Sequence, residues 1–153
     1  MTLIKKIDIT DPEIAEEVLS VQLPSYRVEA ELIDCHDIPP LRDTISTLQR
    51  CGETFYGCYV DEDLGGVISI KLEEGLIDIH RLMVHPKHFR KGIARRLLEF
   101  IESDGEGDET LIVSTGSKNA PAIYFYEKSG FVKTGEVKVM EGLLITSFEK
   151  KRK

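Results

Sequence analysis

The chain has 153 residues, of which 41% are hydrophobic and 31% charged, which is typical of one globular domain with one core. Its formal net charge of −7 argues against nonspecific nucleic-acid binding, which needs a broadly basic surface. No apolar run has the length of a membrane span, and the first six residues lack the apolar segment of a signal peptide, so we expect a cytoplasmic protein.

The first third of the chain predicts a strand followed by helices. Asp11 and Pro12 give an N-cap and a first-turn proline, so a helix begins there. Pro39-Pro40 then breaks the chain before another apolar pattern of helical spacing. We expect a strand at residues 2–9 and helices at about 11–22, 26–33 and 41–48.

The remaining two thirds alternate between strands and helices. Three runs separated by polar turns predict an antiparallel meander, and the last two runs predict a closing hairpin. Asn119 caps a helix that ends at Gly130. We expect strands at 53–60, 66–72, 76–84, 109–115, 131–140 and 142–149, helices at 91–103 and 119–130, a loop at 104–108, and a solvated, frayed end at 150–153.

This order of elements predicts the fold class. It indicates an α/β (α+β) domain spanning residues 1–153, with a mixed, mostly antiparallel sheet of six or seven strands and helices on both faces. The strands at 76–84 and 109–115 are joined through a helix, so they are expected to run parallel. Cys35, Cys51 and Cys58 are odd in number and lack metal-ligand spacing, which favours reduced thiols and no metal site.

Residues 80–98 form a basic stretch inside this acidic protein. The stretch holds six Lys and Arg residues, three histidines and no carboxylate. It runs from a strand through a short turn into a helix that opens at Gly92. The first N–H groups of a helix have no intrahelical partners and lie at the positive end of its dipole, so an anion fits there. Gly92 has no Cβ to hold a phosphate away from the backbone.

Two motifs in this half of the chain resemble a known superfamily. The first is Leu82-x-Val84-His85-Pro86 followed by Arg90-Lys91-Gly92-Ile93-Ala94, and the second is Asn119-x-x-Ala122-x-x-Phe125-Tyr126-Glu127-Lys128-x-Gly130-Phe131. Their content, order and separation resemble the GNAT-type acyl-CoA N-acetyltransferases. The resemblance covers roughly residues 53–149 and implies that acetyl-CoA is the cosubstrate.

The resemblance assigns a role to each motif. The loop at Gly92 holds the pyrophosphate, the backbone of residues 82–84 pairs with pantetheine or faces the thioester carbonyl, and Asn119 contacts pantetheine. Tyr126 lies beside the thioester sulfur as a general acid, although a core aromatic is its alternative interpretation. The implied acetyl-CoA residues are Leu82, Met83, Val84, Arg90, Lys91, Gly92, Ile93, Ala94, Arg95, Asn119 and Tyr126. A solvated helix face is the alternative for Arg95.

One position departs from the pattern. The superfamily signature begins with Gln or Arg, and this chain has Phe89 there. The family binds mainly through backbone amides at this loop, and Arg90 offers a nearby charge. The departure keeps a second hypothesis open, in which the protein is a catalytically inactive CoA-binding sensor or regulatory module.

The predicted reaction also needs a base, because an amine acceptor is largely protonated near neutral pH. In a regular strand over residues 76–84, Asp78, His80, Leu82 and Val84 share one face. This placement brings a carboxylate and an imidazole together, and His80 is the group that titrates near neutrality. Glu53, an ordered water, or a purely structural role for His80 are the alternatives.

Residues 1–52 resemble the family only as a strand plus helices, the part that usually shapes the acceptor pocket. Their acidic and aromatic side chains either line a pocket for a cationic amine or form solvated helix faces: Tyr26, Glu29, Glu31, Asp34, His36 and Asp37. The predicted function is transfer of an acetyl group from acetyl-CoA to a primary amine by direct attack in a ternary complex. Polyamine, aminoglycoside, amino acid and protein N-terminus all remain open as acceptors, and so does a homodimer through the C-terminal strands.

Overall fold

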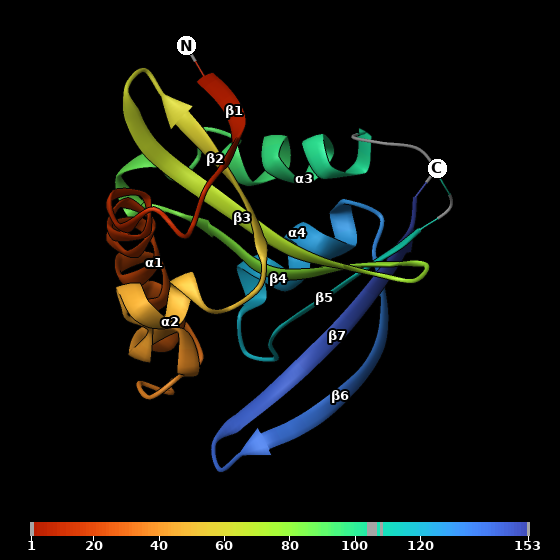
Figure 1. Cartoon of the computed structure of the whole chain (residues 1–153). Coiled ribbons are helices and arrows are strands. Elements are labelled where there is room, and N and C mark those ends of the chain that lie inside the picture. The colour runs from red at the N-terminus through yellow and green to blue at the C-terminus, as the bar shows by residue number, and fades with distance from the viewer. Residues whose placement is uncertain (1, 104–106, 108, 153) are drawn as a thin grey trace.

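The computed structural model describes residues 2–103, 107 and 109–152. In this part of the chain, seven strands form one sheet in the order β1-β2-β3-β4-β5-β7-β6 (Figure 1). Every neighbouring pair is antiparallel except β4 and β5. The strands are β1 (Thr2–Ile7), β2 (Thr54–Val60), β3 (Asp63–Glu73), β4 (Leu76–Val84), β5 (Thr110–Gly116), β6 (Val132–Met140) and β7 (Leu143–Lys151). The predicted mixed, mostly antiparallel sheet is confirmed.

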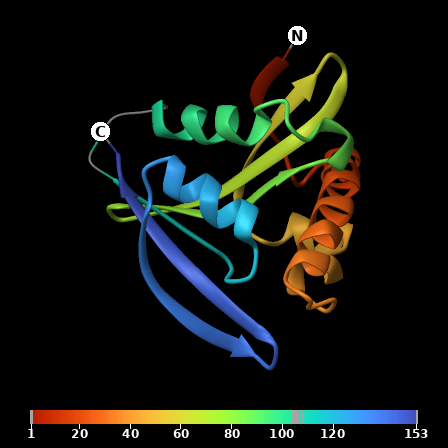
Figure 2. The same cartoon turned by 180° about the vertical axis from the view of Figure 1, so that it is seen from behind.

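Helices cover both faces of the sheet (Figures 1 and 2). They are α1 (Pro12–Leu32), α2 (Ile45–Gln49), α3 (Ile93–Ser103) and α4 (Ala120–Lys128), with short 3-10 turns η1 (Pro39–Arg42) and η2 (Pro86–His88). One core lies between the sheet and α3 and α4, and includes Ile68, Leu97 and Tyr126. A second core lies under α1 and α2, and includes Val18 and Phe55.

The parallel strands β4 and β5 separate soon after they begin. They pair over three positions, from Leu76 with Thr110 to Asp78 with Ile112. Beyond these positions β4 stays with β3, while β5 continues beside β7. The β6–β7 hairpin therefore diverges from the β1–β4 half of the sheet (Figure 1). This divergence opens the cavity in which the candidate site lies.

The helices in the first third of the chain differ from the sequence prediction. The two helices expected at 11–22 and 26–33 are one continuous helix, α1, with Pro24 in its interior. An interior proline removes one backbone hydrogen bond and costs about 3 kcal/mol relative to alanine. The buried stripe through Ala15, Val18 and Val21 anchors the helix on the sheet and offsets this cost.

The prediction of one helix at 41–48 is also wrong. The chain forms η1, pauses in extended conformation at Asp43, and starts α2 from the Thr44 N-cap. Thr44 Oγ1 accepts from the N–H of Thr47, and Thr47 Oγ1 accepts from the N–H of Thr44. This capping box fixes the start of α2 at Ile45, four residues after the predicted start at 41.

A bulge in β4 corrects another expectation. Ser69 pairs with Arg81 and Ile70 pairs with Ile79, so His80 is an extra residue in the strand. The extra residue reverses the alternation of side chains beyond it. Leu82 therefore packs with the α3–α4 core that also holds Ile79, and it does not share a face with Asp78.

Residues 150–152, predicted to be frayed, are instead held against the fold. Lys150 and Lys151 belong to β7, and Lys150 Nζ lies 2.6 Å from Glu102 Oε2. Arg152 donates to the backbone oxygen of Glu102 at 2.9 Å. These contacts hold the end of β7 against the last turn of α3. Residues 104–106, 108 and 153, on which part of the predicted loop and tail falls, lie outside the described residues.

Candidate active site

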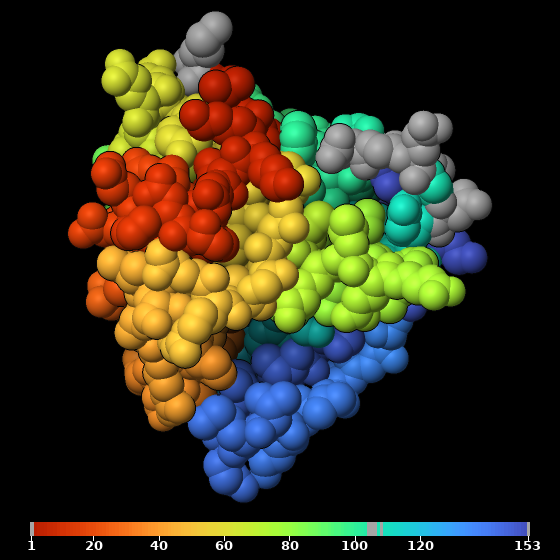
Figure 3. All heavy atoms as spheres, in the orientation of Figure 1, coloured from red at the N-terminus to blue at the C-terminus, as the bar shows by residue number. Residues whose placement is uncertain are grey.

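A cavity of about 1140 Å³ lies where β4 and β5 have separated. Its walls come from α1, the second half of β4, the β4–α3 loop, the end of β5 and α4. Figure 3 shows the surface hollowed where the orange α1–α2 segment, green β4 and the blue hairpin meet. Ten of the eleven residues predicted for acetyl-CoA line this cavity, and Lys91 is the exception.

The loop before α3 presents free backbone amides to the cavity. Gly92 has a φ of +75°, a left-handed conformation that glycine adopts without strain. Arg96 is the first residue of α3 whose N–H bonds a carbonyl of the chain, Gly92 O at 3.1 Å. The described residues supply no acceptor for the amides of 92–95. These amides and the positive end of the helix dipole form an anion site.

The start of α3 is held close to the sheet. A Cβ built on Gly66 of β3 would lie 2.5 Å from Ile93 Cγ2 and 3.3 Å from Leu97 Cδ1. Because Gly66 has no side chain, the first turn of α3 can sit directly on β3. The packing of α3 therefore fixes the position of the anion site.

The side chains of the loop divide into two groups. Arg90 and Arg95 line the cavity, as does the 43% exposed ring of Phe89. Lys91 instead donates to Nδ1 of the buried His88 at 2.9 Å. An ammonium group can only donate, so His88 accepts at Nδ1 and its Nε2–H donates to Asp63 at 2.9 Å. This chain of contacts anchors Lys91 beside the cavity wall.

One edge of β4 faces the cavity without a partner strand. Residues 79–84 pair with β3 on one side, while the described part of β5 pairs with β4 no further than Asp78. The backbone groups on the open side are available to an extended ligand containing amides, which can bind as an added strand. The backbone prediction for residues 82–84 thus has a matching feature in the structure.

The ring of Tyr126 lies in the core, and its hydroxyl is available as a hydrogen-bond donor. Its ring packs against Phe131 and Phe148 at centroid distances of 5.4 and 5.8 Å. It also lines the cavity, and no hydrogen bond to its hydroxyl is found within the described ranges. Burial, with a smaller contribution from the charge of Glu29, raises the pKa of Tyr126 far above its ordinary value. The hydroxyl is therefore a proton-bearing donor.

Asn119 joins α4 to α1. Its Oδ1 accepts from the N–H of Ala122 at 3.2 Å, which confirms the predicted N-cap. It also lowers the pKa of the Glu29 carboxyl on α1, against the larger effect of burial, which raises it.

His80 lies between two carboxylates. Its Nε2 is 3.2 Å from Asp78 Oδ2 and its Nδ1 is 3.5 Å from Glu53 Oε2. His80 lines the cavity, whereas Asp78 and Glu53 stand behind it. The bulge that separates His80 from the face of Leu82 thus still brings Asp78 and His80 together, and it adds Glu53.

Arg81 organises a buried polar cluster that sequence reasoning missed. Its guanidinium lies 2.9 Å from Glu53 and 2.6 Å from Asp43, and it donates to Gln22 at 3.0 Å. Ser69 also donates to Glu53, at 2.6 Å. Arg81 belongs to the basic stretch for which the sequence predicts anion binding, but in the structure it forms ion pairs with Glu53 and Asp43. The position of Arg81 inside a strand was the one available signal.

Burial acts on the two acids of this cluster but does not prevent their ionisation. Burial raises the pKa of Glu53, and hydrogen bonds from Arg81 and Ser69 outweigh it, so the net pKa lies below the ordinary value. The pKa of Asp43 is lowered in the same way, against burial, mainly by its hydrogen bond from Arg81. The three charges form a fixed group under α1 with one cation between two acids.

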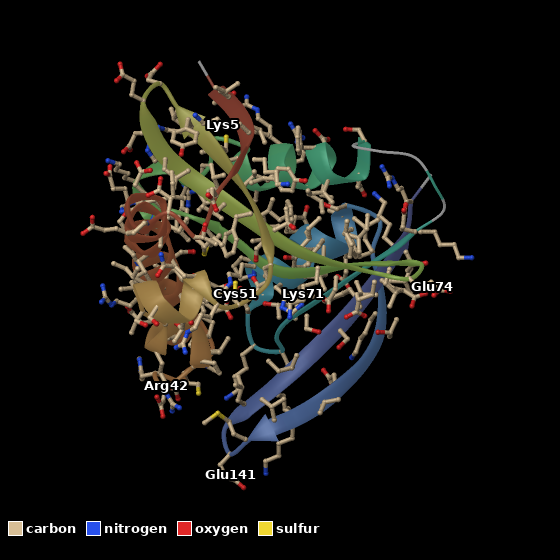
Figure 4. All side chains as sticks on the ribbon, in the orientation of Figure 1. Lys5, Arg42, Cys51, Lys71, Glu74 and Glu141 are labelled. Atoms are coloured by element: carbon tan, nitrogen blue, oxygen red, sulfur yellow. The ribbon has the colours of Figure 1, made fainter. Side chains whose placement is uncertain are left out.

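The predicted acceptor-side residues separate into two sets. Tyr26 and Glu29 are partly buried and line the cavity from α1. The other four are exposed and do not line it: Glu31, Asp34, His36 and Asp37. Asp37 forms an ion pair with Arg42, which projects from the outer end of η1 (Figure 4).

Three further features concern metals, membranes and cysteines. No group of three or more potential metal ligands is found within the residues that the structure describes. In the same part of the chain, no helix combines the length and apolarity needed to cross a membrane. Cys35, Cys51 and Cys58 are all free thiols, as the sequence predicted.

Comparison with known proteins places these features in a family. A model described as "Acetyltransferase (GNAT) domain" matches residues 37–152. The chain is 39% identical to UPF0157 protein YqkA of Bacillus subtilis (strain 168) over 95% of its length, and 38% identical to an IAA acetyltransferase of Azospirillum brasilense over 56% of its length. It spans 43% and 53% of these two relatives, respectively.

Solved structures share the fold. The PaiA N-acetyltransferase of Thermoplasma acidophilum, solved in complex with coenzyme A, superposes with a TM-score of 0.72 at 18% identity, covering 98% of this chain and 99% of that one. The free amides before α3, the divergent β4 and β5, and the match of the domain model agree with one another. The chain belongs to the GNAT acetyltransferase family.

Proposed function

We propose that this protein transfers an acetyl group from acetyl-CoA to a primary amine. The observation that carries the proposal is the run of uncapped amides at residues 92–95, which opens into the same cavity as Tyr126 and the free edge of β4. An anion site, an amide-pairing strand edge and a proton donor in one cavity match the diphosphate, the pantetheine and the thioester of one ligand.

The residues of the cavity fit this ligand in order. The amides of 92–95, with Arg90 and Arg95, would hold the pyrophosphate. The backbone of residues 82–84 would pair with pantetheine, and Asn119 would contact it from α4. When bound, acetyl-CoA supplies an activated carbonyl and a thiolate leaving group.

Tyr126 and the β4 backbone would assist direct attack by the amine. The new C–N bond forms at the thioester carbonyl as the C–S bond breaks, and the sulfur carries away the electron pair. Tyr126 donates a hydrogen bond to that sulfur, because its raised pKa keeps the proton on the phenol. An N–H among residues 82–84 would stabilise the negative charge on the carbonyl oxygen.

His80 would receive at Nδ1 the proton that the amine loses. It reaches the cavity wall, with Asp78 3.2 Å from Nε2 and Glu53 3.5 Å from Nδ1. The neutral ring would donate its Nε2–H to Asp78, which leaves the Nδ1 lone pair to take the proton, and both carboxylates would stabilise the imidazolium. Transfer occurs directly or through a water.

The remaining predictions belong to this proposal. Residues 1–52 form the acceptor side and residues 53–149 the acetyl-CoA side of one domain. The acceptor is a small-molecule or peptide amine, and the reaction takes place in the cytoplasm. A homodimer through the C-terminal strands stays an open prediction.

Calorimetric titration with acetyl-CoA tests the anion site. Gly92→Glu places a carboxylate at the free amides, so we expect acetyl-CoA binding to be lost. Gly75→Glu is the matched control, because Gly75 has a similar φ of +77° and, like Gly92, open space where a Cβ would lie, but belongs to the β3–β4 turn. Equal affinity in the wild type and Gly92→Glu, or no binding by the wild type, would contradict the proposal.

Thiol release across a panel of amines tests the transfer itself. Tyr126→Phe should lower the turnover rate and leave acetyl-CoA affinity intact, since only the hydroxyl is removed. Tyr124→Phe, on the exposed face of the same helix, is the control. Tight acetyl-CoA binding without release of thiol on any amine would favour the alternative, a CoA-binding regulatory module, to which the Phe89 departure points.

A further inference from the structure

We infer that Glu29 of α1 binds the positively charged amine of the acceptor, and that the enzyme therefore selects amines without a neighbouring carboxylate. The inference rests on the proposed acetyl transfer and names the substrate class of that same cavity. Its basis is one partly buried carboxylate in the cavity wall that forms no ion pair with the described residues.

The placement of Glu29 follows from two helices. Tyr26 and Glu29 are three residues apart on α1, so they lie on one face of the helix, and both line the cavity. Asn119, at the start of α4, also lines the cavity and lowers the pKa of the Glu29 carboxyl from the other side. The charge of Glu29 also acts on Tyr126. Glu29 thus lies on the acceptor wall near the proposed proton donor.

The charges around Glu29 leave it without a counter-ion. No Lys, Arg or His of the described chain lies within ion-pair distance of its carboxylate. Of the other basic residues in the wall, Arg81 is committed to Glu53 and Asp43, and Lys150 to Glu102 at 2.6 Å. Burial accordingly raises the pKa of Glu29, and the hydrogen bond from Asn119 offsets this in part.

An ammonium group supplies what this carboxylate lacks. Charge-assisted hydrogen bonds from an ammonium to a partly buried carboxylate are stronger than neutral ones, and they compensate the desolvation of both groups. Glu29 would thereby hold the acceptor nitrogen beside Tyr126 before its proton leaves. An α-amino acid would bring its own carboxylate next to Glu29, and like charges repel. A simple alkylamine or a polyamine meets no such repulsion.

Steady-state thiol release measures this selection with butylamine, spermidine and glycine as probes. We expect Glu29→Gln to raise the KM for butylamine and spermidine about tenfold, the loss of one charge-assisted hydrogen bond. The KM for acetyl-CoA should not change. The ratio of kcat/KM for butylamine to kcat/KM for glycine should fall. Glu31→Gln, exposed on the same helix, is the matched control, and Glu29→Asp should recover part of the loss.

Titration of the CoA-saturated protein with butylamine and spermidine separates this inference from the proposed function. Amine binding that weakens in Glu29→Gln, in a wild type that releases no thiol, would support the inference and contradict acetyl transfer. Turnover with an unchanged amine KM in Glu29→Gln would overturn the inference and leave acetyl transfer standing. Absence of amine binding to the CoA-saturated wild type would also overturn it.

Discussion

Two groups of acids on the α1 side of the sheet have opposite environments. Glu53 and Asp43 surround Arg81, with contacts of 2.9 and 2.6 Å, and both have lowered pKa values. Glu29 is also partly buried, but it has the Asn119 amide and no cation, and its pKa is raised. Burial opposes ionisation in all three, so the cation decides the direction of the shift.

The two environments indicate two roles: the Arg81 cluster stabilises the fold, whereas Glu29 is available to a ligand. The Arg81 cluster joins α1, the η1–α2 connection, β2 and β4 through Gln22, Asp43 and Glu53. Arg81 pairs with both acids, so the cluster holds the α1 wall of the cavity in place. Glu29 stands in that wall with its charge unmatched, and an incoming cation would satisfy it. Three variants or conditions test this contrast, from the largest expected effect to the smallest.

Arg81→Leu should give the largest effect. It leaves Glu53 and Asp43 buried without their cation, and breaking such a group costs about 3–5 kcal/mol in the free energy of unfolding. Denaturant unfolding followed by circular dichroism measures the loss. Arg42→Leu is the control, because the pair of Arg42 with Asp37 is exposed and contributes little. Equal stabilities of the Arg81 and Arg42 variants would show that the cluster is not structural.

Acid should act on the same cluster, with a smaller effect because the protonated Glu53 and Asp43 side chains stay in place and can still accept hydrogen bonds from Arg81. The pKa values of Glu53 and Asp43 lie below their ordinary values of 4.5 and 3.8 in the folded protein. Between the two states, the unfolded chain then binds more protons in that range. Their stabilisation is complete above the ordinary values and is lost as the pH falls through the folded values.

Denaturant midpoints measured from neutral pH down to the acid range follow this loss. Glu53→Gln should flatten the decline, since one of the two titrating groups is gone. Ser69→Ala should flatten it less, because it removes one of several hydrogen bonds to Glu53. An unchanged pH profile in Glu53→Gln would place the acid sensitivity elsewhere in the molecule.

Glu29→Gln should have the smallest effect on stability, and with the opposite sign. A raised pKa means that the folded protein binds protons more readily than the unfolded chain, so stability falls as the pH rises through that range. At neutral pH the charged Glu29 therefore costs stability, and its removal should raise the free energy of unfolding by up to about 1 kcal/mol. Equilibrium unfolding at neutral pH checks the sign. A large destabilisation would mean that Glu29 has a cation or a structural role.

The parts of the site that sequence predicted are local in the chain. The amides at Gly92 and the cap at Asn119 each depend on a few consecutive residues whose helix signals can be read directly. The Arg81 cluster joins residues from 22 to 81, and no local pattern connects them. The β4 bulge depends on the pairing of Ser69 and Ile70 with β4, so a regular alternation placed Leu82 on the wrong face. Lys91 was assigned by its charge, whereas its contact with His88 depends on the packing of η2.

The short ladder between β4 and β5 has a mechanical consequence. In the part of the chain that the structure describes, three residue pairs join the two halves of the sheet directly. A long, amide-rich molecule bound between the separated strands would bridge the β1–β4 half and the β5–β7 half of the sheet. Slower amide hydrogen exchange along residues 79–84 on addition of acetyl-CoA would show that the ligand bridges the two halves.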